Sequence, residues 1–94
     1  MNTIKLTYTK KTSNKYTFLT IVNGKTIGDR DYTGTKEDHE LYAGFIDFMN
    51  KLIRQELDAN PKFTFKNVDE FRAWANSSVQ KQYIDYLNSL GDKD

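Results

Sequence analysis

The dipeptide Asn23-Gly24 constrains this chain more than any other feature, because it lies between two runs rich in aromatic and β-branched residues. Both residues tolerate a positive φ, which a type I′ hairpin turn requires at its two central positions. The turn predicts an antiparallel hairpin with these pairs: Val22 with Lys25, Ile21 with Thr26, and Thr20 with Ile27. Phe18 and Ile27 are then expected on one face of the sheet.

Gly28 interrupts the alternation of the strand that follows the turn. In a regular strand Tyr32 would lie on the face opposite Ile27. One inserted residue near Gly28 or Asp29 would return Tyr32 to the same face as Ile27. We therefore predict a β-bulge at this point.

A further strand precedes the hairpin. Ile4, Leu6 and Tyr8 alternate with threonines and a lysine, which is the period of a strand with one buried face. The polar run 10–14 is a connecting loop to the strand at 16–22. We therefore predict a three-stranded β-meander over residues 1–33.

A long amphipathic helix is predicted over residues 35–58. Thr35 suits the N-cap, and Glu37 and Asp38 suit the positive end of the helix dipole. Apolar residues then recur at spacings of three and four. The helix is expected to stop near Asp58, because Pro61 disfavours a helical conformation in the residue before it.

A C-terminal helical segment is predicted over residues 67–90. Asn67 is a good N-cap, and Glu70 occupies the capping-box position three residues later. Residues 76–78 are weak helix formers, so the segment is either two short helices or one bent helix. Residues 63–65 are either a short strand or an extended connection.

These elements predict one α+β domain over residues 1–94: a three-stranded antiparallel β-meander with two or three helices packed on one face. The chain has 94 residues, no cysteine and a net charge of +1. The absence of cysteine fits a reducing compartment. The first residues form no apolar signal segment, and no apolar run approaches the roughly 18 residues of a membrane span. We therefore expect a cytoplasmic protein that does not enter a membrane.

No pattern typical of catalysis stands out. His39 is the only histidine, and with only surface carboxylates beside it we expect a solvated helix residue. Asp29 and Asp31 would share one side of their strand, with Arg30 opposite. Paired carboxylates can bind Mg²⁺ or transfer protons, but they usually need a third carboxylate or a histidine. We expect edge residues or partner contacts here, no metal, no cofactor and no enzyme activity.

Charge divides the chain unevenly. Residues 1–33 hold six basic and two acidic residues, whereas residues 34–94 hold eight basic and eleven acidic residues. A basic sheet with aromatic residues can stack single-stranded bases, so a small nucleic-acid-binding protein is one alternative function. Tyr8 argues against it, because Tyr8 shares a face with core residues. An oligomeric structural or accessory protein is a second alternative.

The chain also carries more tyrosines than a core of this size easily hides. The candidates for exposure are Tyr32, Tyr42, Tyr83 and Tyr86. Tyrosine is common in protein interfaces, because it supplies a rigid contact area and a hydroxyl. The surplus therefore favours a protein-binding function.

The eleven-residue segment Val22-Asn23-Gly24-Lys25-Thr26-Ile27-Gly28-Asp29-Arg30-Asp31-Tyr32 resembles the central hairpin of a small phage-encoded anti-CRISPR family of the type I-F class. That hairpin carries Val-Asn-Gly-Lys, a β-branched residue and glycine, then Arg-Asp and an aromatic residue, and a helix follows. Here the helix is longer, and a further helical segment follows it. The resemblance implies a phage or mobile-element inhibitor, acting in the host cytoplasm, that binds a protein subunit of a CRISPR-Cas complex and blocks target DNA.

We therefore expect a non-enzymatic protein-binding inhibitor. The residues expected to contact its partner lie in or beside the first three strands: Arg30, Asp31, Tyr32, Asp29, Lys25, Tyr16, Lys10 and Lys11.

Overall fold

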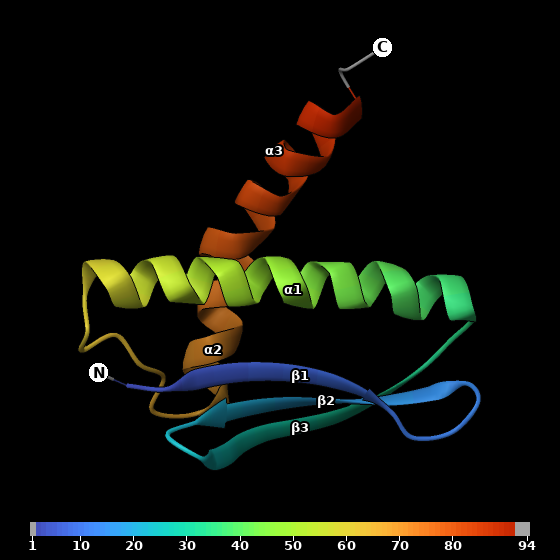
Figure 1. The fold of residues 1–94 in the computed structure, drawn as a ribbon, viewed down its shortest axis with the longest axis horizontal. Coiled ribbons are helices and arrows are strands. Elements are labelled where there is room, and N and C mark those ends of the chain that lie inside the picture. Colours follow the sequence, from blue (N-terminus) through green and yellow to red (C-terminus); the bar gives the residue numbers. More distant parts are fainter. Residues whose placement is uncertain (1, 92–94) are drawn as a thin grey trace.

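The computed structural model describes residues 2–91. The chain forms the elements β1 (Ile4–Lys10), β2 (Lys15–Val22), β3 (Lys25–Thr33), α1 (Lys36–Ala59), α2 (Val68–Trp74), a π-helical turn η1 (Ala75–Val79) and α3 (Gln80–Gly91). The strands form one antiparallel sheet in the order β1-β2-β3, with the helices on one of its faces (Figure 1). The predicted α+β fold is therefore confirmed.

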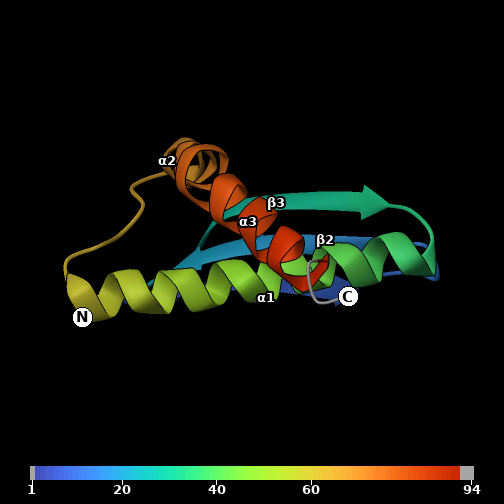
Figure 2. The same cartoon turned by 90° about the horizontal axis from the view of Figure 1, so that it is seen from above.

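The core lies between the sheet and the helices. Ile4, Leu6, Phe18 and Val22 contribute from the strands, and they pack against apolar residues of α1 and of the C-terminal helical segment. The buried apolar helix residues are Ile46, Met49, Leu52, Ile53, Leu57, Phe71 and Val79. Seen from above, α1 runs across the sheet on the side of β1, and α2 lies on the side of β3 (Figure 2). The two helical segments thus cover different parts of the same face of the sheet.

The Asn23-Gly24 turn has the predicted geometry, with φ of 52° at Asn23 and 81° at Gly24. The first two predicted pairs are confirmed, but the third is wrong. Thr20 pairs with Gly28, so Ile27 is the inserted residue of the bulge. The bulge thus lies one residue before Gly28, and it returns Tyr32 to the core side as predicted.

Gly28 also sets how closely β3 approaches α2. A Cβ atom on Gly28 would lie 2.7 Å from Cγ2 of Val68, the first residue of α2. Real Cβ atoms essentially never come so close, so an alanine would push the strand and the helix apart. The glycine is required here by space, not by a positive φ.

The change Gly28→Ala is therefore expected to lower the free energy of unfolding by about 1–2 kcal/mol, measured by urea denaturation. The double change Gly28→Ala with Val68→Ala is the control, because it removes the methyl group that the new Cβ would meet. The double variant should lose less stability than the sum of the two single changes. If the stability losses of the two single changes simply add in the double variant, the close contact between residues 28 and 68 is contradicted.

The α1 helix begins and ends as its sequence predicts. Thr35 Oγ1 accepts a hydrogen bond from the Asp38 N–H at 3.1 Å, and Asp38 Oδ2 accepts one from the Thr35 N–H at 3.0 Å. At the other end Asn60 is extended, with φ of −146°, immediately before Pro61. The described helix starts and ends one residue later than the predicted span.

The capping box makes stability depend on pH. Hydrogen bonds from the backbone N–H and then from the side chain of Thr35 lower the pKa of Asp38 below its ordinary value. A lowered folded-state pKa stabilises the fold above the unfolded-state pKa, and this contribution is lost as pH falls through the folded-state pKa. We expect Asp38→Asn to melt at a lower temperature than the wild type at pH 7, with the difference shrinking as the pH falls below 3.8, the ordinary value. A difference that grows in acid would contradict this.

The C-terminal segment is one continuous helical path, not two separate helices. Asn67 Oδ1 accepts from the Glu70 N–H at 3.0 Å, which confirms the N-cap. The Glu70 carboxylate accepts from the N–H of Lys66, not of Asn67, so only half of the predicted capping box forms. Residues 63–65 are an extended connection without a strand.

The π turn keeps the buried side of this path in phase. Its Gln80 N–H donates to the carbonyl of Ala75, five residues earlier. In a regular α-helix, a side chain four residues further along is rotated by about 40° around the helix axis from the first. Phe71, Ala75, Val79 and Tyr83 have this spacing, and the wider π turn compensates for this rotation. Val79 consequently remains completely buried.

The edge of β1 is closed by a side chain of α1. The Leu6 N–H donates to Asn50 Oδ1 at 3.1 Å, and Asn50 Nδ2 donates to the Leu6 carbonyl at 3.0 Å. Asn50 thus takes the place of a neighbouring strand at the middle of an edge strand. An edge with its hydrogen-bonding groups occupied is less able to pair with another chain.

Candidate functional site

The predicted contact residues of β3 lie on both faces of the sheet. Arg30 pairs with Phe18 and Tyr32 pairs with Tyr16, which places Arg30 and Tyr32 on the helix-covered face. Asp29 and Asp31 alternate with them and share the other side of the strand, as predicted; this side is the open face of the sheet. Lys25 is exposed beside the turn, and Lys10 is exposed at the end of β1. The structure therefore does not bring the eight predicted residues together, and their contact with a partner stays a prediction.

On the open face, Asp31 is engaged by its own sheet. Thr17 Oγ1 donates to Asp31 Oδ1 at 2.8 Å, and Lys11 Nζ lies 3.2 Å from Asp31 Oδ2. The Thr17 hydroxyl first, and then Lys11, lower the pKa of Asp31 below its ordinary value. Within residues 2–91 no cluster of three or more histidine, aspartate or glutamate side chains could hold a metal ion.

His39 is buried, not solvated, so the expectation for it was wrong. Its side chain is among the best-covered polar groups, with 4% exposure. Nε2 lies 2.9 Å from the Asn14 carbonyl oxygen, and Nδ1 lies 2.6 Å from the Tyr8 hydroxyl. A carbonyl can only accept, so Nε2 carries the proton, and in the neutral ring Nδ1 accepts from Tyr8. The imidazole also stacks on Tyr16, with 4.1 Å between ring centroids.

A signal for this burial is present in the sequence. His39 precedes Tyr42, Ile46, Met49 and Ile53 at spacings of three and four, so it is the first position of the apolar stripe of α1. The neighbouring acidic residues concealed this. Since His39, Tyr8 and Tyr16 bind one another, the cluster fixes the β1–β2 loop to α1. Burial raises the pKa of Tyr8 above its ordinary value, which keeps its hydroxyl protonated as a donor.

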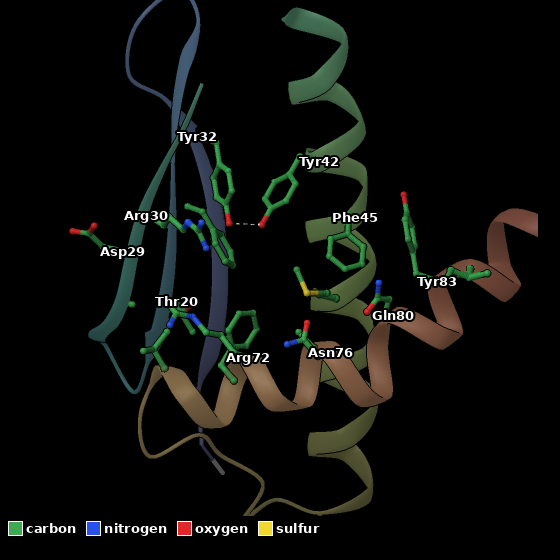
Figure 3. Close-up of a pocket in the computed structure, with 17 residues that line it drawn as sticks. Thr20, Asp29, Arg30, Tyr32, Tyr42, Phe45, Arg72, Asn76, Gln80 and Tyr83 are labelled. Carbon is green, nitrogen blue, oxygen red and sulfur yellow. Dashed lines mark hydrogen bonds between the residues drawn. The ribbon is translucent and has the colours of Figure 1, made fainter. Parts of the chain in front are cut away.

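A hollow of about 490 Å³ opens between β3, α1 and the C-terminal helical segment (Figure 3). Aromatic rings of the sheet, of α1 and of the C-terminal helical segment line it. They are Phe18 of β2, Tyr32 of β3, Tyr42 and Phe45 of α1, Phe71 of α2 and Tyr83 of α3. The Tyr42 hydroxyl donates to the Tyr32 hydroxyl at 3.0 Å across it. Burial first, and then this hydrogen bond, raise the pKa of Tyr42 above its ordinary value, so the hydroxyl stays neutral.

The polar groups of the hollow are mostly cationic or amide groups. Arg30 and Arg72 line it together with Asn76 and Gln80. The Arg30 guanidinium carbon lies 5.3 Å from the centroid of the Tyr32 ring. Asp29 also borders the hollow, but its side chain points away from it (Figure 3). Arg30 does lie on an edge strand, as expected, and it also borders an aromatic hollow that the packing of the helices creates.

The exposed apolar surface lies mainly on α3, which extends past α1 and away from the sheet (Figure 1). Ile84 is 50% exposed, and Tyr86 and Leu87 are each 46% exposed. Tyr86 is thus exposed as expected, whereas Tyr32, Tyr42 and Tyr83 are half-buried. Tyr83 packs between Phe45 and Phe48, at centroid distances of 4.7 and 5.2 Å.

Among the helices described in residues 2–91, none is long and apolar enough to cross a membrane. No protein-family model, curated protein or solved structure matches this chain.

Proposed function

We propose that this chain is a non-enzymatic protein-binding module that acts as an inhibitor. The observation that carries the proposal is the exposed apolar surface of α3, where Ile84 and Leu87 lie three residues apart on one side and Tyr86 is exposed beside Phe48. Large apolar side chains that gather on one surface commonly mark a site of protein interaction. A helix that leaves the body of the domain can place such a side in the apolar groove of a partner.

The hairpin supports a more specific identity. Residues 22–32 resemble the central hairpin of the type I-F anti-CRISPR family, and in this chain they form β3, its turn and the end of β2, with α1 following. We therefore propose a phage or mobile-element protein that acts in the cytoplasm of a host. Its partner is a protein subunit of a CRISPR-Cas effector complex, and binding keeps that complex from target DNA.

Binding to a purified type I-F effector complex tests this proposal, measured by biolayer interferometry with the wild-type chain. We expect the double change Ile84→Glu and Leu87→Glu to weaken binding by at least about tenfold, because each exposed apolar contact would be replaced by a charge. The matched control is Lys81→Glu with Gln82→Glu, two exposed positions on the same helix. Equal affinity of both double variants would remove α3 from the interface. No binding by the wild-type chain would overturn the CRISPR-Cas assignment.

The alternative of nucleic-acid binding has less geometric support. Tyr8, Tyr16 and Phe18 lie on the helix-covered face, so the open face has no aromatic platform among the described strand residues. That face carries mainly threonines, together with Leu19 and Ile21, and its two lysines, Lys5 and Lys15, are matched in number by Asp29 and Asp31. We therefore expect no binding of single-stranded DNA even at low salt, where electrostatic binding is strongest. Salt-dependent binding that disappears when Lys10, Lys11 and Lys15 are neutralised would favour the alternative.

A further inference from the structure

The hollow beside β3 exists because of two irregularities in the chain. At one end, Gly28 allows β3 to approach Val68 closely, which holds the start of α2 against the sheet. At the other end, the π turn places Ala75 and Asn76 on the wall of the hollow. Such turns frequently occur at functional sites, where they re-aim side chains. The two features leave a hollow open between β3, α1 and the C-terminal helical segment.

The interior of the hollow suits an apolar body. Phe18, Phe45, Met49 and Phe71 line it, and the half-buried rings of Tyr32 and Tyr42 complete the wall. Its volume of about 490 Å³ falls within the range of sites that bind small organic molecules, about 300–1,000 Å³. Aromatic side chains that meet at tilted and edge-on angles favour a ring in the ligand, because a ring can pack against both their faces and their edges.

The charged side chains of the hollow indicate that its ligand is negatively charged. Figure 3 shows Arg72 extending from α2 toward β3, on the side of the hollow that also holds Arg30. Of the two ion pairs within residues 2–91, neither involves Arg30, and the Arg72–Asp69 pair is long at 3.8 Å and exposed. Asp29 is the single acidic residue lining the hollow within the described chain, and it points outward. The guanidinium groups of Arg30 and Arg72 are therefore accessible to an anionic ligand.

We propose that the hollow binds a small organic anion with an aromatic body and a carboxylate. The ring lies among Phe18, Tyr42 and Phe45, and the carboxylate accepts hydrogen bonds from Arg30 and Arg72. Guanidinium groups match carboxylate geometry with two parallel hydrogen bonds, which makes arginine the preferred residue for this recognition. The Asn76 and Gln80 side chains, which border the same opening, supply further donors. Ile84 borders both this hollow and the exposed surface of α3, whereas Leu87 does not line the hollow.

Titration with 2-naphthoate tests the proposal, with the full chain observed by isothermal calorimetry and by NMR. We expect saturable binding to one site, with shifts concentrated on the signals of Ala75, Gln80 and Tyr42. The uncharged analogue 2-naphthamide should bind at least about tenfold more weakly, because it lacks the charge that Arg30 and Arg72 recognise. No saturable binding at about millimolar 2-naphthoate would overturn the proposal.

Variants locate the site. Arg30→Gln and Arg72→Gln should each weaken 2-naphthoate binding by at least about tenfold, since each removes a charge-assisted hydrogen-bond donor. Both arginines are exposed, so the fold should persist, and circular dichroism checks this. Arg54→Gln is the matched control, because Arg54 is an exposed arginine on α1 that borders a different cleft. Equal affinity in all three variants, or equal affinity for the amide and the carboxylate, would contradict the assignment. The single change Leu87→Glu should leave 2-naphthoate binding normal, because Leu87 does not line the hollow, and this separates the outcome from that of the protein-binding proposal.

Discussion

Replacing His39 with alanine is expected to lower the free energy of unfolding by about 2–4 kcal/mol. The change removes a fully enclosed imidazole and leaves the Tyr8 hydroxyl and the Asn14 carbonyl without their partner. It also opens a cavity beside the Tyr16 ring. Domains of this kind are stable by only about 5–15 kcal/mol, so such a loss would be a large share of the total. Urea denaturation followed by circular dichroism measures it.

Two further variants separate the contributions of His39. His39→Phe retains an aromatic ring against Tyr16 but cannot bond Tyr8 or Asn14, so it should remain clearly less stable than the wild type. Glu40→Ala is the matched control on the same turn of α1, and its exposed side chain should change stability by less than about 0.5 kcal/mol. A wild-type stability of His39→Phe would show that packing, not hydrogen bonding, explains the burial of this residue.

The second large effect is expected for Asn50→Leu, at about 2–3 kcal/mol. Leucine has nearly the same size but cannot bond the backbone of Leu6, whose N–H and carbonyl both rely on the Asn50 amide. The freed edge of β1 would then be open to pairing with another chain. We therefore expect a lower urea midpoint together with concentration-dependent self-association, measured by light scattering.

Lys51→Leu is the matched control for this change. Lys51 is the next residue of α1 and is exposed, so the control adds the same apolar side chain without disturbing Leu6. It should remain close to wild-type stability and monomeric behaviour. If both variants self-associate equally, the added apolar surface, not the open strand edge, is the cause.

The features that the sequence predicted correctly are those that neighbouring residues determine among themselves. Asn23-Gly24 specifies its turn because few residue types tolerate two successive positive φ angles. Thr35 and Asp38 cap α1 through bonds that span three residues. The bulge was predictable from the alternation of β3, but its position was not: it was expected near Gly28 or Asp29, and Ile27 is the inserted residue. The pairing of distant surfaces has no such local signal.

The site illustrates the difference. Arg30 and Tyr32 were selected for their place beside the hairpin, and the fold does expose Arg30. That Arg30 shares a hollow with Arg72 depends on the packing of α2 against β3, between residues 42 positions apart in the chain. The exposed side of α3 likewise depends on how far the helix extends past α1. An apolar stripe in a sequence shows which residues of a helix can be buried. It does not show how much of that helix another element of the fold covers.

The sequence by itself determined the β-meander, its bulge, the helix caps and the order of the elements, because these follow from backbone preferences and from hydrogen bonds between near neighbours. Only the tertiary structure decided that His39 is buried, that Asn50 closes β1, and that a hollow with two arginines forms beside β3. Each of these needs the relative position of two elements. That position is set by how side chains far apart in the chain fill space together.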